Sequence, residues 1–333
     1  MHESLPVTIT GTGSYLPVTR LPSTVFDQRF GRATGWSEKR YGIHSRAVAV
    51  NELSSEMAVA ASVDALQQAG LNPEDLDLII SASSLMEQPI PTLAVQIQNQ
   101  LGLSDLGTPV LDINATCLGF LSALDTISYA IAAGRYGHVL IVCSELPSRG
   151  LNWDDPEASV IFGDGAAAAV VSRTPSQNES RIIASSVRTF SDGGPTCQFR
   201  AGGTRINPHE DIDAFLNGAK FELDGKAAFK VVAKHIDAFV HSLLDEAGLN
   251  ISDIDVVIPH QASALALHHL RNRLGIDEGR IIDIFSNHGN QVSASIPTAL
   301  HKGIMTERLS RGNTALLIGT SAGISIGGMV LQY

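Results

Sequence analysis

Long apolar runs, basic residues and cysteines are all scarce in this chain of 333 residues. No run of about 18 apolar residues occurs, which argues against a membrane-spanning helix, and the N-terminal segment lacks the basic and apolar parts of a signal peptide. Lys and Arg total 23 against 34 Asp and Glu, a formal charge of −11, which disfavours binding to nucleic-acid phosphates. The three cysteines are few and odd in number, as is typical of reduced thiols. We therefore expect a cytoplasmic protein with neither membrane nor nucleic-acid partners.

Apolar residues are nevertheless abundant, at 44% of the chain, and the length suits one large or two medium units. Short apolar runs of the buried-strand type alternate with segments of helical periodicity, as expected when helices cover both faces of a sheet. The expected strands lie at 7–13, 78–82, 110–113 and 139–143, and the expected helices at 54–70, 118–134 and 226–247. This alternation indicates an α/β fold.

A weak internal repeat divides the chain. Residues 69–80 (AGLNPEDLDLII) return 178 positions later as residues 247–258 (AGLNISDIDVVI). Two further pairs follow in the same order, 100–103 with 273–276 and 110–113 with 281–284. A chance match is the alternative, but three ordered matches favour duplication. We therefore expect two similar halves, residues 1–176 and 177–333, with a site where they meet.

Cys117 is the best candidate nucleophile. It directly precedes the apolar run 118–134, so we expect it at the first turn of a buried helix. Unpaired backbone N–H groups and the positive end of the helix dipole favour a thiolate there, which predicts a lowered pKa. The alternative is a small buried hydrophobic residue. Cys143 in an apolar strand and Cys197 in a Gly/Pro loop lack this setting, and we expect them to be structural.

His260 and Asn290 are the candidate partners of this cysteine. His260 directly follows the apolar segment 256–259, and Asn290 lies in a second strand-to-helix turn, 286–295. Open α/β sheets place functional groups at the carboxyl ends of their strands. A cysteine, a histidine and an asparagine in one cleft supply a nucleophile and two donors to a thioester oxygen. Satisfied polar residues on ordinary turns are the alternative.

Other motifs in the chain do not predict chemistry. Residues 319–323 (GTSAG) fit the serine-hydrolase elbow, but that motif needs a following helix and a later histidine, whereas the ten remaining residues have a strand pattern. The glycines of 11–13 and 162–165 fall short of a dinucleotide or phosphate loop, and tight turns explain them. No metal-binding pattern occurs, so we expect no metal.

The chain contains, in this order, Cys117, His260-Gln-Ala and His288-Gly-Asn. With these motifs it resembles the β-ketoacyl-acyl carrier protein synthase III group of the thiolase superfamily, and the resemblance runs from about Gly11 to the last strand. Further matches are the segments 35–43, 96–98, 162–166 and 229–230. The resemblance implies the duplicated thiolase fold, with five layers (α-β-α-β-α) and two similar halves, and a homodimer.

By that resemblance the protein is an acyltransferase of fatty-acid or secondary metabolism, with coenzyme A thioesters as substrates and no cofactor. Cys117 attacks an acyl-CoA and carries the acyl group, and the backbone N–H groups of Cys117 and Ala322 form the oxyanion hole. His260 and Asn290 then bind the carbonyl of malonyl-ACP or malonyl-CoA while it loses CO2. The enolate attacks the acyl-cysteine and gives a 3-ketoacyl thioester, which is a decarboxylative Claisen condensation.

The resemblance also implies a path for coenzyme A. Trp36 and Arg40 match the positions that sandwich the adenine, and Phe229, Ala262 and Ser263 match positions along the pantetheine tunnel. Stacking on an aromatic face and a guanidinium suits a planar base. An ordinary surface pair is the alternative for Trp36 and Arg40.

Several positions depart from the family pattern. Residues 154–160 lack an expected Arg, Ser263-Ala replaces an Asn and a basic residue that dock the carrier protein, and Ser321-Ala-Gly replaces three glycines. Docking of an acyl carrier protein would then fall to the remaining basic candidates, Lys226, Lys230, Arg271 and Arg273. Ile90 stands where an aromatic gate is usual, so we expect a longer acyl pocket and a medium-chain or longer primer.

Two alternative functions stay open at this point. A relative that condenses acyl chains without decarboxylation, or transfers the acyl group to another acceptor in secondary metabolism, often carries a glutamate near the nucleophile, and Glu87 lies on a suitable loop. The second alternative is a non-catalytic thiolase-fold partner subunit. Retention of Cys117, His260 and Asn290 together argues against it, since an inactive partner does not need the set.

Overall fold

Two β-sheets contain the long strands of the protein, for which the computed structural model describes residues 4–333. The first sheet consists of β1 (Val7–Tyr15), β4 (Leu78–Ser81), β5 (Val110–Asp112), β6 (His138–Glu145) and β7 (Gly165–Arg173), in the order β1-β7-β6-β4-β5. The second consists of β8 (Arg181–Thr189), β11 (Val256–Pro259), β12 (Thr314–Ser321) and β13 (Ser325–Gln332), in the order β11-β12-β13-β8. The boundary that the sequence places after residue 176 falls in the loop between β7 and β8.

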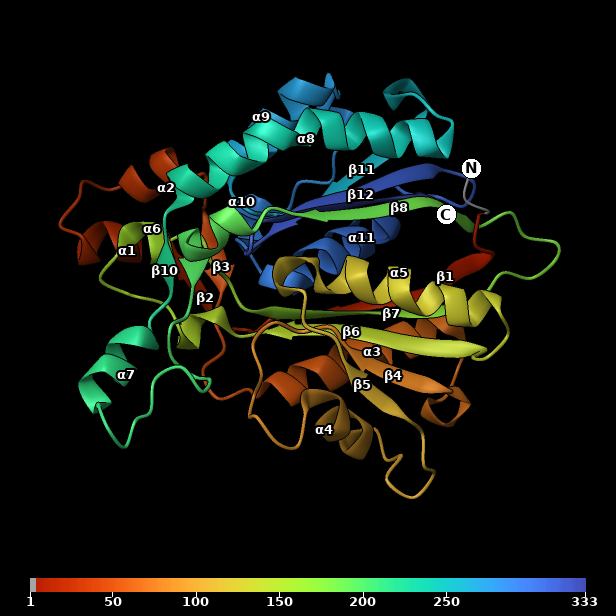
Figure 1. The fold of residues 1–333 in the computed structure, drawn as a ribbon, viewed down its shortest axis with the longest axis horizontal. Coiled ribbons are helices and arrows are strands. Elements are labelled where there is room, and N and C mark those ends of the chain that lie inside the picture. The colour runs from red at the N-terminus through yellow and green to blue at the C-terminus, as the bar shows by residue number, and fades with distance from the viewer. Residues whose placement is uncertain (1–3) are drawn as a thin grey trace.

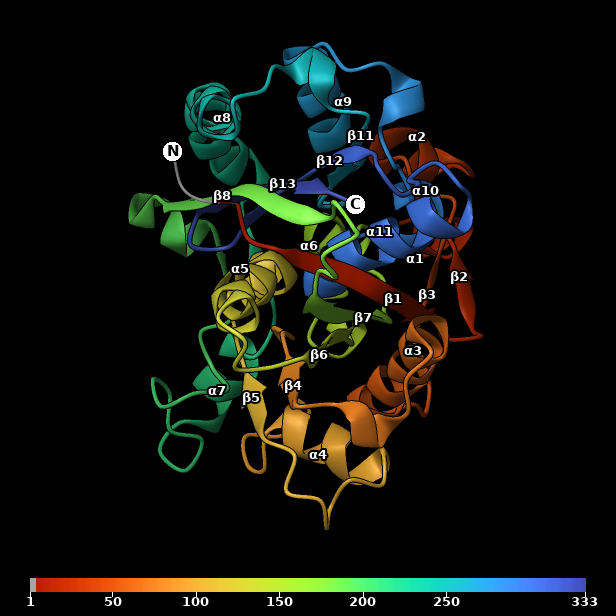
Figure 2. The same cartoon turned by 90° about the vertical axis from the view of Figure 1, so that its right-hand side faces the viewer.

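Helices form three further layers (Figures 1 and 2). Between the sheets lie α5 (Gly119–Ala132) and α11 (Ser295–Met305). The outer face of the second sheet is covered by α8 (Gly225–Ala247) and α9 (Ala264–Leu274), and that of the first by α3 (Ser54–Ala69) and α4 (Leu93–Gln100). The expected order α-β-α-β-α is therefore confirmed.

Short elements gather mainly at one end of these layers, on the left in Figure 1. They are β2 (Arg20–Pro22), α1 (Thr24–Arg29), α2 (Trp36–Tyr41), β3 (Ser45–Ala47), α6 (Pro156–Ser159), β9 (Cys197–Gln198), α7 (Ile212–Gly218), β10 (Glu222–Leu223) and α10 (Phe285–His288). Short 3-10 helices lie at Pro73–Asp75, Thr116–Leu118, Pro147–Arg149, Ser191–Thr196, Ile251–Asp253, Glu278–Arg280 and Val292–Ala294. Within residues 4–333, no helix combines the length and apolar character needed to cross a bilayer.

The sequence repeat corresponds to a structural repeat. In the first copy α3 ends at Gly70 (φ 68°), and the N–H of Asn72 then bonds the carboxylate of Asp75 at 2.8 Å before β4 begins. The second copy, after α8, makes the same contacts at the positions 178 residues later, before β11 begins. The likeness fades at the third repeated segment, where β5 of the first copy corresponds only to a single bridge between Ile281 and Val257.

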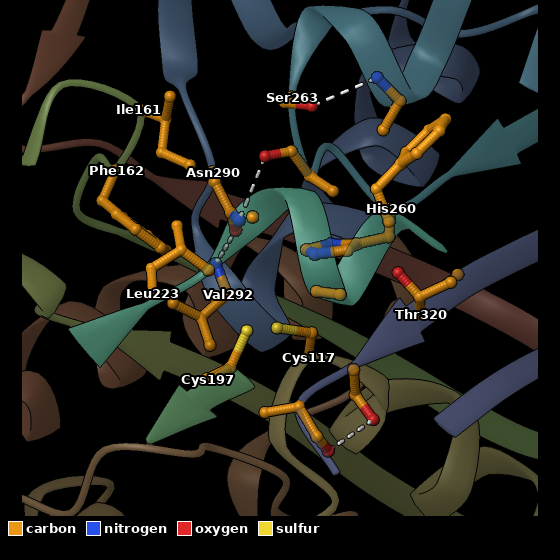
Figure 3. Close-up of a pocket in the computed structure, with 18 of the residues that line it drawn as sticks. Cys117, Ile161, Phe162, Cys197, Leu223, His260, Ser263, Asn290, Val292 and Thr320 are labelled. Atoms are coloured by element: carbon orange, nitrogen blue, oxygen red, sulfur yellow. Dashed lines mark hydrogen bonds between the residues drawn. The ribbon is translucent and has the colours of Figure 1, made fainter. Parts of the chain in front are cut away.

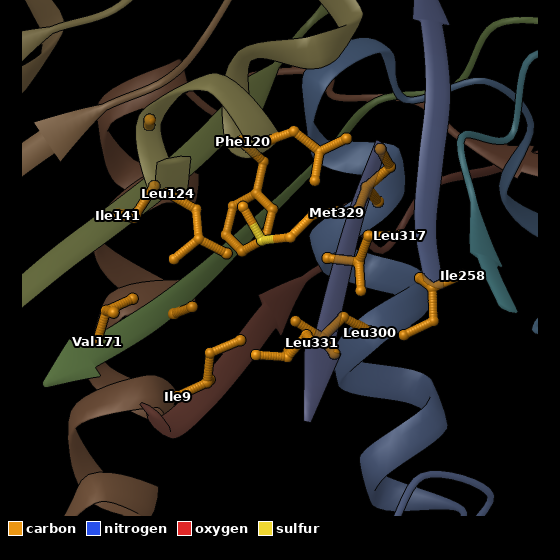
Figure 4. Packing of buried hydrophobic residues seen from close by; sticks show 14 of the residues in the cluster. Ile9, Phe120, Leu124, Ile141, Val171, Ile258, Leu300, Leu317, Met329 and Leu331 are labelled. Atoms are coloured by element: carbon orange, nitrogen blue, oxygen red, sulfur yellow. The ribbon is translucent and has the colours of Figure 1, made fainter. Parts of the chain in front are cut away.

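The central helices and both sheets share one buried apolar cluster (Figure 4). Phe120 and Leu124 of α5, Leu300 of α11 and Met329 of β13 belong to it, together with Ile9 of β1. Each such side chain contributes about 1.5–3 kcal/mol when fully buried. This cluster fixes the starts of α5 and α11, and the turns that precede these two helices carry Cys117 and Asn290.

Candidate active site

A pocket of about 690 Å³ brings the three candidate catalytic residues together (Figure 3). Cys117 enters it from the 3-10 turn before α5, His260 from the end of β11, and Asn290 from the turn between α10 and α11. Apolar side chains form most of the remaining wall, among them Leu85, Leu151, Ile161, Phe162, Phe199, Phe221, Leu223, Val232, Ile318 and Ile324. The pocket thus combines a thiol, an imidazole and a carboxamide in apolar surroundings.

The backbone immediately before Cys117 is strained. Thr116 has φ = 49°, which a β-branched residue rarely adopts. Its N–H is held by the side-chain oxygen of Asn114 at 3.0 Å. The sharp turn lets α5 begin two residues after the cysteine, at Gly119, and directs the sulfur into the pocket.

The prediction of a lowered pKa for Cys117 is wrong. Burial raises the pKa of this thiol to about 12, and the charges of Glu145 and Cys197 add to the rise. Hydrogen bonds from the backbone N–H groups of Cys117 and Ala322 offset only part of it. Desolvation of the sulfur therefore raises the pKa by more than the helix N-terminus, on which the sequence prediction relied, lowers it. At pH 7 the resting thiol is neutral.

His260 is a neutral imidazole at physiological pH. It follows β11, and its backbone N–H bonds the carbonyl of Ile318 at 2.8 Å. Burial lowers the pKa of His260 to about 4. Within residues 4–333 its Nδ1 atom has no hydrogen-bond partner. An uncharged ring offers one N–H donor and one acceptor nitrogen to a bound molecule.

Asn290 is fixed by both its backbone and its side chain. Its N–H bonds the carbonyl of Ile161 at 2.7 Å, and its Oδ1 accepts the N–H of Val292 at 2.8 Å. One long bond of 3.4 Å joins its Nδ2 to the carbonyl of Ala262. Because the amide oxygen is occupied, the Nδ2 group is the part of Asn290 that remains to donate into the pocket.

The turn at residues 162–165, expected to be only a tight turn, holds Asn290 in place. The N–H of Gly163 donates to the carbonyl of Asn290 at 3.1 Å. A Cβ at Gly163 would lie 2.1 Å from the carbonyl oxygen of His288, so only glycine allows this approach. The buried carboxylate of Asp164 accepts the N–H and the hydroxyl of Ser148 at 3.0 and 2.6 Å, which anchors the turn.

Gly163→Ala should displace the Asn290 turn. A methyl group so close to a backbone carbonyl forces the two segments apart, and we expect a loss of about 1–3 kcal/mol in the free energy of unfolding. Condensing activity should fall by more than the unfolded fraction explains. Urea unfolding and turnover are measured beside Gly203→Ala, whose Cβ would meet nothing within 4 Å. Equal behaviour of the two variants would contradict this role.

Glu145 is a buried acid that the sequence analysis did not identify. Its carboxylate accepts the N–H groups of Ser84 and Leu85 at 2.6 and 3.1 Å and the hydroxyl of Ser293 at 2.5 Å. Ser84 and Leu85 line the pocket, and Ser293 lies three residues after Asn290. Glu145 therefore ties the pocket wall of one half to the Asn290 turn of the other. Burial raises the pKa of Glu145 to about 7, against the opposing effect of these hydrogen bonds.

Glu145→Gln should flatten the pH dependence of stability. A carboxyl with a raised pKa binds more protons folded than unfolded between about pH 4.5 and pH 7, so its contribution to the free energy of unfolding falls as the pH rises through that window. We expect the wild type to lose about 2–3 kcal/mol relative to the variant across it. Urea unfolding at the two ends of the window measures this, and parallel curves would refute it.

Trp36 and Arg40, which the resemblance places on the two sides of the adenine, have different neighbours in the single chain. The guanidinium of Arg32 lies 5.2 Å from the Trp36 ring, whereas that of Arg40 lies 5.5 Å from the Tyr41 ring. Arg40 also approaches Glu157 at 3.6 Å. Arg40 and Tyr41 line the pocket, but Trp36 does not. Trp36 instead packs edge-on against Tyr41, with ring centroids 5.7 Å apart.

The residues expected along the pantetheine tunnel and at the oxyanion hole do line the pocket: Phe229, Ala262, Ser263 and Ala322. Phe229 packs edge-on against His269, with ring centroids 4.8 Å apart. The hydroxyl of Ser263 accepts the N–H of Ala266 at 3.1 Å and so caps α9. Of the basic candidates only Lys226 lines the pocket, while Arg271 pairs with Glu278 at 3.0 Å.

Two loop residues lie outside the pocket of the single chain. Ile90 is 85% exposed and does not line it, because its loop runs along the surface. Glu87 does not line it either, and its carboxylate accepts the N–H of Ser55 at 2.8 Å at the start of α3. Ile90 therefore does not line the cavity of the single chain, and the observed contact of Glu87 is with the start of α3.

Comparisons with known proteins agree with this geometry. Residues 111–193 match the family model of 3-oxoacyl-[acyl-carrier-protein (ACP)] synthase III, and residues 244–333 match the model of its C-terminal part. The β-ketoacyl-[acyl-carrier-protein] synthase III of Neisseria meningitidis is 33% identical over 330 residues, covering 98% of each chain.

Solved structures show the same likeness. The 3-oxoacyl-[acyl-carrier-protein] synthase III of Aquifex aeolicus is 32% identical and superimposes with a TM-score of 0.87, over 98% of this chain and all of that one. The priming β-ketosynthase of the R1128 polyketide pathway is 29% identical, with a TM-score of 0.88 over 99% and 97% of the two chains.

The fold and these likenesses define a condensing enzyme of the thiolase superfamily. The chain belongs to the 3-oxoacyl-[acyl-carrier-protein] synthase III family and is an acyltransferase. The alternative of a non-catalytic partner subunit is therefore wrong.

Proposed function

We propose that the protein condenses an acyl-CoA primer with a malonyl thioester, carried on an acyl carrier protein or on coenzyme A, through an acyl-cysteine intermediate. One observation supports this most directly: Cys117, His260 and Asn290, from three distant segments, line a single pocket in a chain of this family. The products are a 3-ketoacyl thioester, CO2 and free coenzyme A. No cofactor takes part, because every bond change is completed by the substrates and these side chains.

In the first half-reaction the Cys117 sulfur attacks the acyl thioester. Its high pKa means that the negative charge is not held on the resting sulfur and arises only during attack. The neutral imidazole of His260 is the proton acceptor available in the pocket. Negative charge then moves to the thioester oxygen, where the backbone N–H groups of Cys117 and Ala322 are the proposed donors. When this intermediate collapses, the bond to the coenzyme A sulfur breaks, and the leaving thiolate takes the proton from His260, which makes the imidazole neutral again.

In the second half-reaction the same imidazole and Asn290 act as donors. Loss of CO2 from a malonyl thioester leaves an enolate whose charge lies on the thioester oxygen. A neutral His260 N–H and the Nδ2 group of Asn290 would stabilise that oxygen. The enolate carbon attacks the acyl-cysteine carbonyl, the C–S bond breaks, and the released Cys117 thiolate takes up a proton from water. A covalent intermediate shared by two half-reactions gives ping-pong kinetics.

The proposed substrate path runs from Arg40 and Lys226 toward Cys117. These two cations line the pocket and could meet the phosphates of coenzyme A, while Phe229 and Ala262 line its apolar part beside the thioester arm. Adenine stacking would fall to Tyr41, which lines the pocket where Trp36 does not. The protein is also proposed to be a cytoplasmic homodimer that has an acyl carrier protein as a partner.

We further propose a medium-chain or longer primer. The support is the large apolar wall of the pocket, which includes Phe199, Phe221 and Leu223. Acyl-enzyme formation is measured across acetyl- to decanoyl-CoA, and kcat/KM should rise by about tenfold or more from acetyl to octanoyl, since each buried CH2 contributes about 0.8 kcal/mol. A clear preference for acetyl would refute the proposal on chain length and leave the condensing reaction intact.

A further inference from the structure

Cys197 faces the candidate nucleophile inside the pocket, although the sequence analysis expected it to be merely structural. Figure 3 shows its sulfur directed toward that of Cys117, and both residues line the cavity. Charge on Cys197 also raises the pKa of Cys117. The third thiol, Cys143, is buried in β6, where it donates to the carbonyl of Ala82 at 3.5 Å, and it does not line the pocket.

The segment that carries Cys197 is short and separate from the large sheets. It lies on β9, which has two residues; among residues 4–333 this strand pairs only with β10, where Cys197 lies opposite Leu223. A disulfide needs Cα atoms about 4.4–6.8 Å apart. An adjustment of β9 toward Cys117 would leave every strand of the two large sheets in register.

We infer that Cys117 and Cys197 form an oxidation-sensitive pair that closes to a disulfide when a hydroperoxide enters the pocket, with Cys197 as the resolving thiol. Cys117 and Cys197 belong to different halves of the chain, so the bond would link the turn before α5 to the pocket wall. It would also keep the nucleophile from irreversible oxidation, because a sulfenic acid beside a second thiol condenses to a disulfide.

The chemistry consumes one hydroperoxide for each disulfide. The Cys117 sulfur attacks the terminal oxygen of the hydroperoxide, the O–O bond breaks, and a sulfenic acid and an alcohol (water, for hydrogen peroxide) result. The Cys197 sulfur then attacks the sulfenic sulfur, and the hydroxyl group leaves with the Cys197 proton as water. Two thiols lose two electrons, and the O–O bond receives them.

The crosslink can form whether or not it affects catalysis. Formation of the disulfide depends only on the placement of the two sulfurs. Loss of acyl transfer on closure rests on the proposed function, because it requires Cys117 to be the nucleophile. The experiment therefore reads the crosslink by mass and the acyl transfer independently.

The wild-type protein is treated with hydrogen peroxide, unfolded in an alkylating agent and weighed intact. Free thiols should fall from three to one, and dithiothreitol should restore all three. A digest without reduction should yield linked peptides that contain Cys117 and Cys197. The matched control Cys143→Ala should form the same link and lose both of its thiols.

Cys197→Ser supplies the opposite control. Its Cys117 should gain one or more oxygen atoms and form no link that dithiothreitol reverses. Wild-type protein that keeps three free thiols, or that adds oxygen to Cys117 while Cys197 stays free, would overturn the inference. Linked protein that still accepts an acyl group would instead refute the role of Cys117 in the proposed function. Reduced protein that accepts none would do the same and leave the crosslink standing.

Discussion

Cys117→Ala should abolish the acyl-enzyme and lower condensation by about 10⁴-fold or more, as removal of a nucleophile does when no other group can carry the intermediate. Methyl replaces thiol in the pocket, so the donors His260 and Asn290 stay in place. We therefore expect the variant to keep decarboxylating a malonyl thioester without condensing it. Intact-mass spectrometry after mixing with an acyl-CoA, together with CO2 release, measures the two half-reactions separately.

Cys143→Ala is the matched control for this loss. Cys143 is also a buried thiol and lies on β6, but it does not line the pocket. Its replacement should retain acyl loading and cost only the stability of a small cavity. An acyl adduct of normal yield on Cys117→Ala, or a comparable loss in Cys143→Ala, would exclude Cys117 as the nucleophile.

His260→Ala and Asn290→Ala should show the reverse pattern. Each removes one donor to the enolate oxygen, which is worth about 3–4 kcal/mol or about 10²–10³-fold in rate. We expect decarboxylation and condensation to fall by this factor in each variant, while Asn290→Ala still accumulates acyl-enzyme. The losses in the double variant should not add fully, because both donors act on the same oxygen.

Asn290→Asp tests the hydrogen-bond donor of this side chain separately from its size. The aspartate keeps the size of the side chain and an oxygen that the N–H of Val292 can meet, but it replaces the donor with a second oxygen. If Asn290 stabilises an enolate, this isosteric change should be at least as harmful as alanine. Retained activity in Asn290→Asp would show that Asn290 only supports the turn.

The sequence predicted the fold because its signals are local. Apolar runs such as 78–82 match the buried strand β4, the helical spacing at 226–247 matches α8, and the two capped turns of the repeat form the same hydrogen bonds. Each signal depends on residues within one or two turns of chain. The likeness of the whole chain to one family supplied the layer order and the candidate triad.

The sequence could not predict properties that depend on distant residues. The pKa of Cys117 is set by burial and by Glu145, Cys197 and Ala322, none of which is a sequence neighbour. The role of Glu145 had a signal, an acid two residues after the apolar run 139–143, but its partners come from two other segments. The contacts of Trp36 with Arg32 and Tyr41 depend on side-chain directions, which residue spacing does not determine.

The central claim is that Cys117 carries the acyl group between two half-reactions in this one pocket. Its most direct test is to mix the wild-type protein with octanoyl-CoA, weigh it intact, locate the adduct by digestion, and then add malonyl thioester. We predict one octanoyl group per chain on Cys117, which disappears as 3-ketoacyl thioester and CO2 form together. An adduct on a different residue, or one on Cys117 that survives the malonyl thioester while product forms, would contradict it.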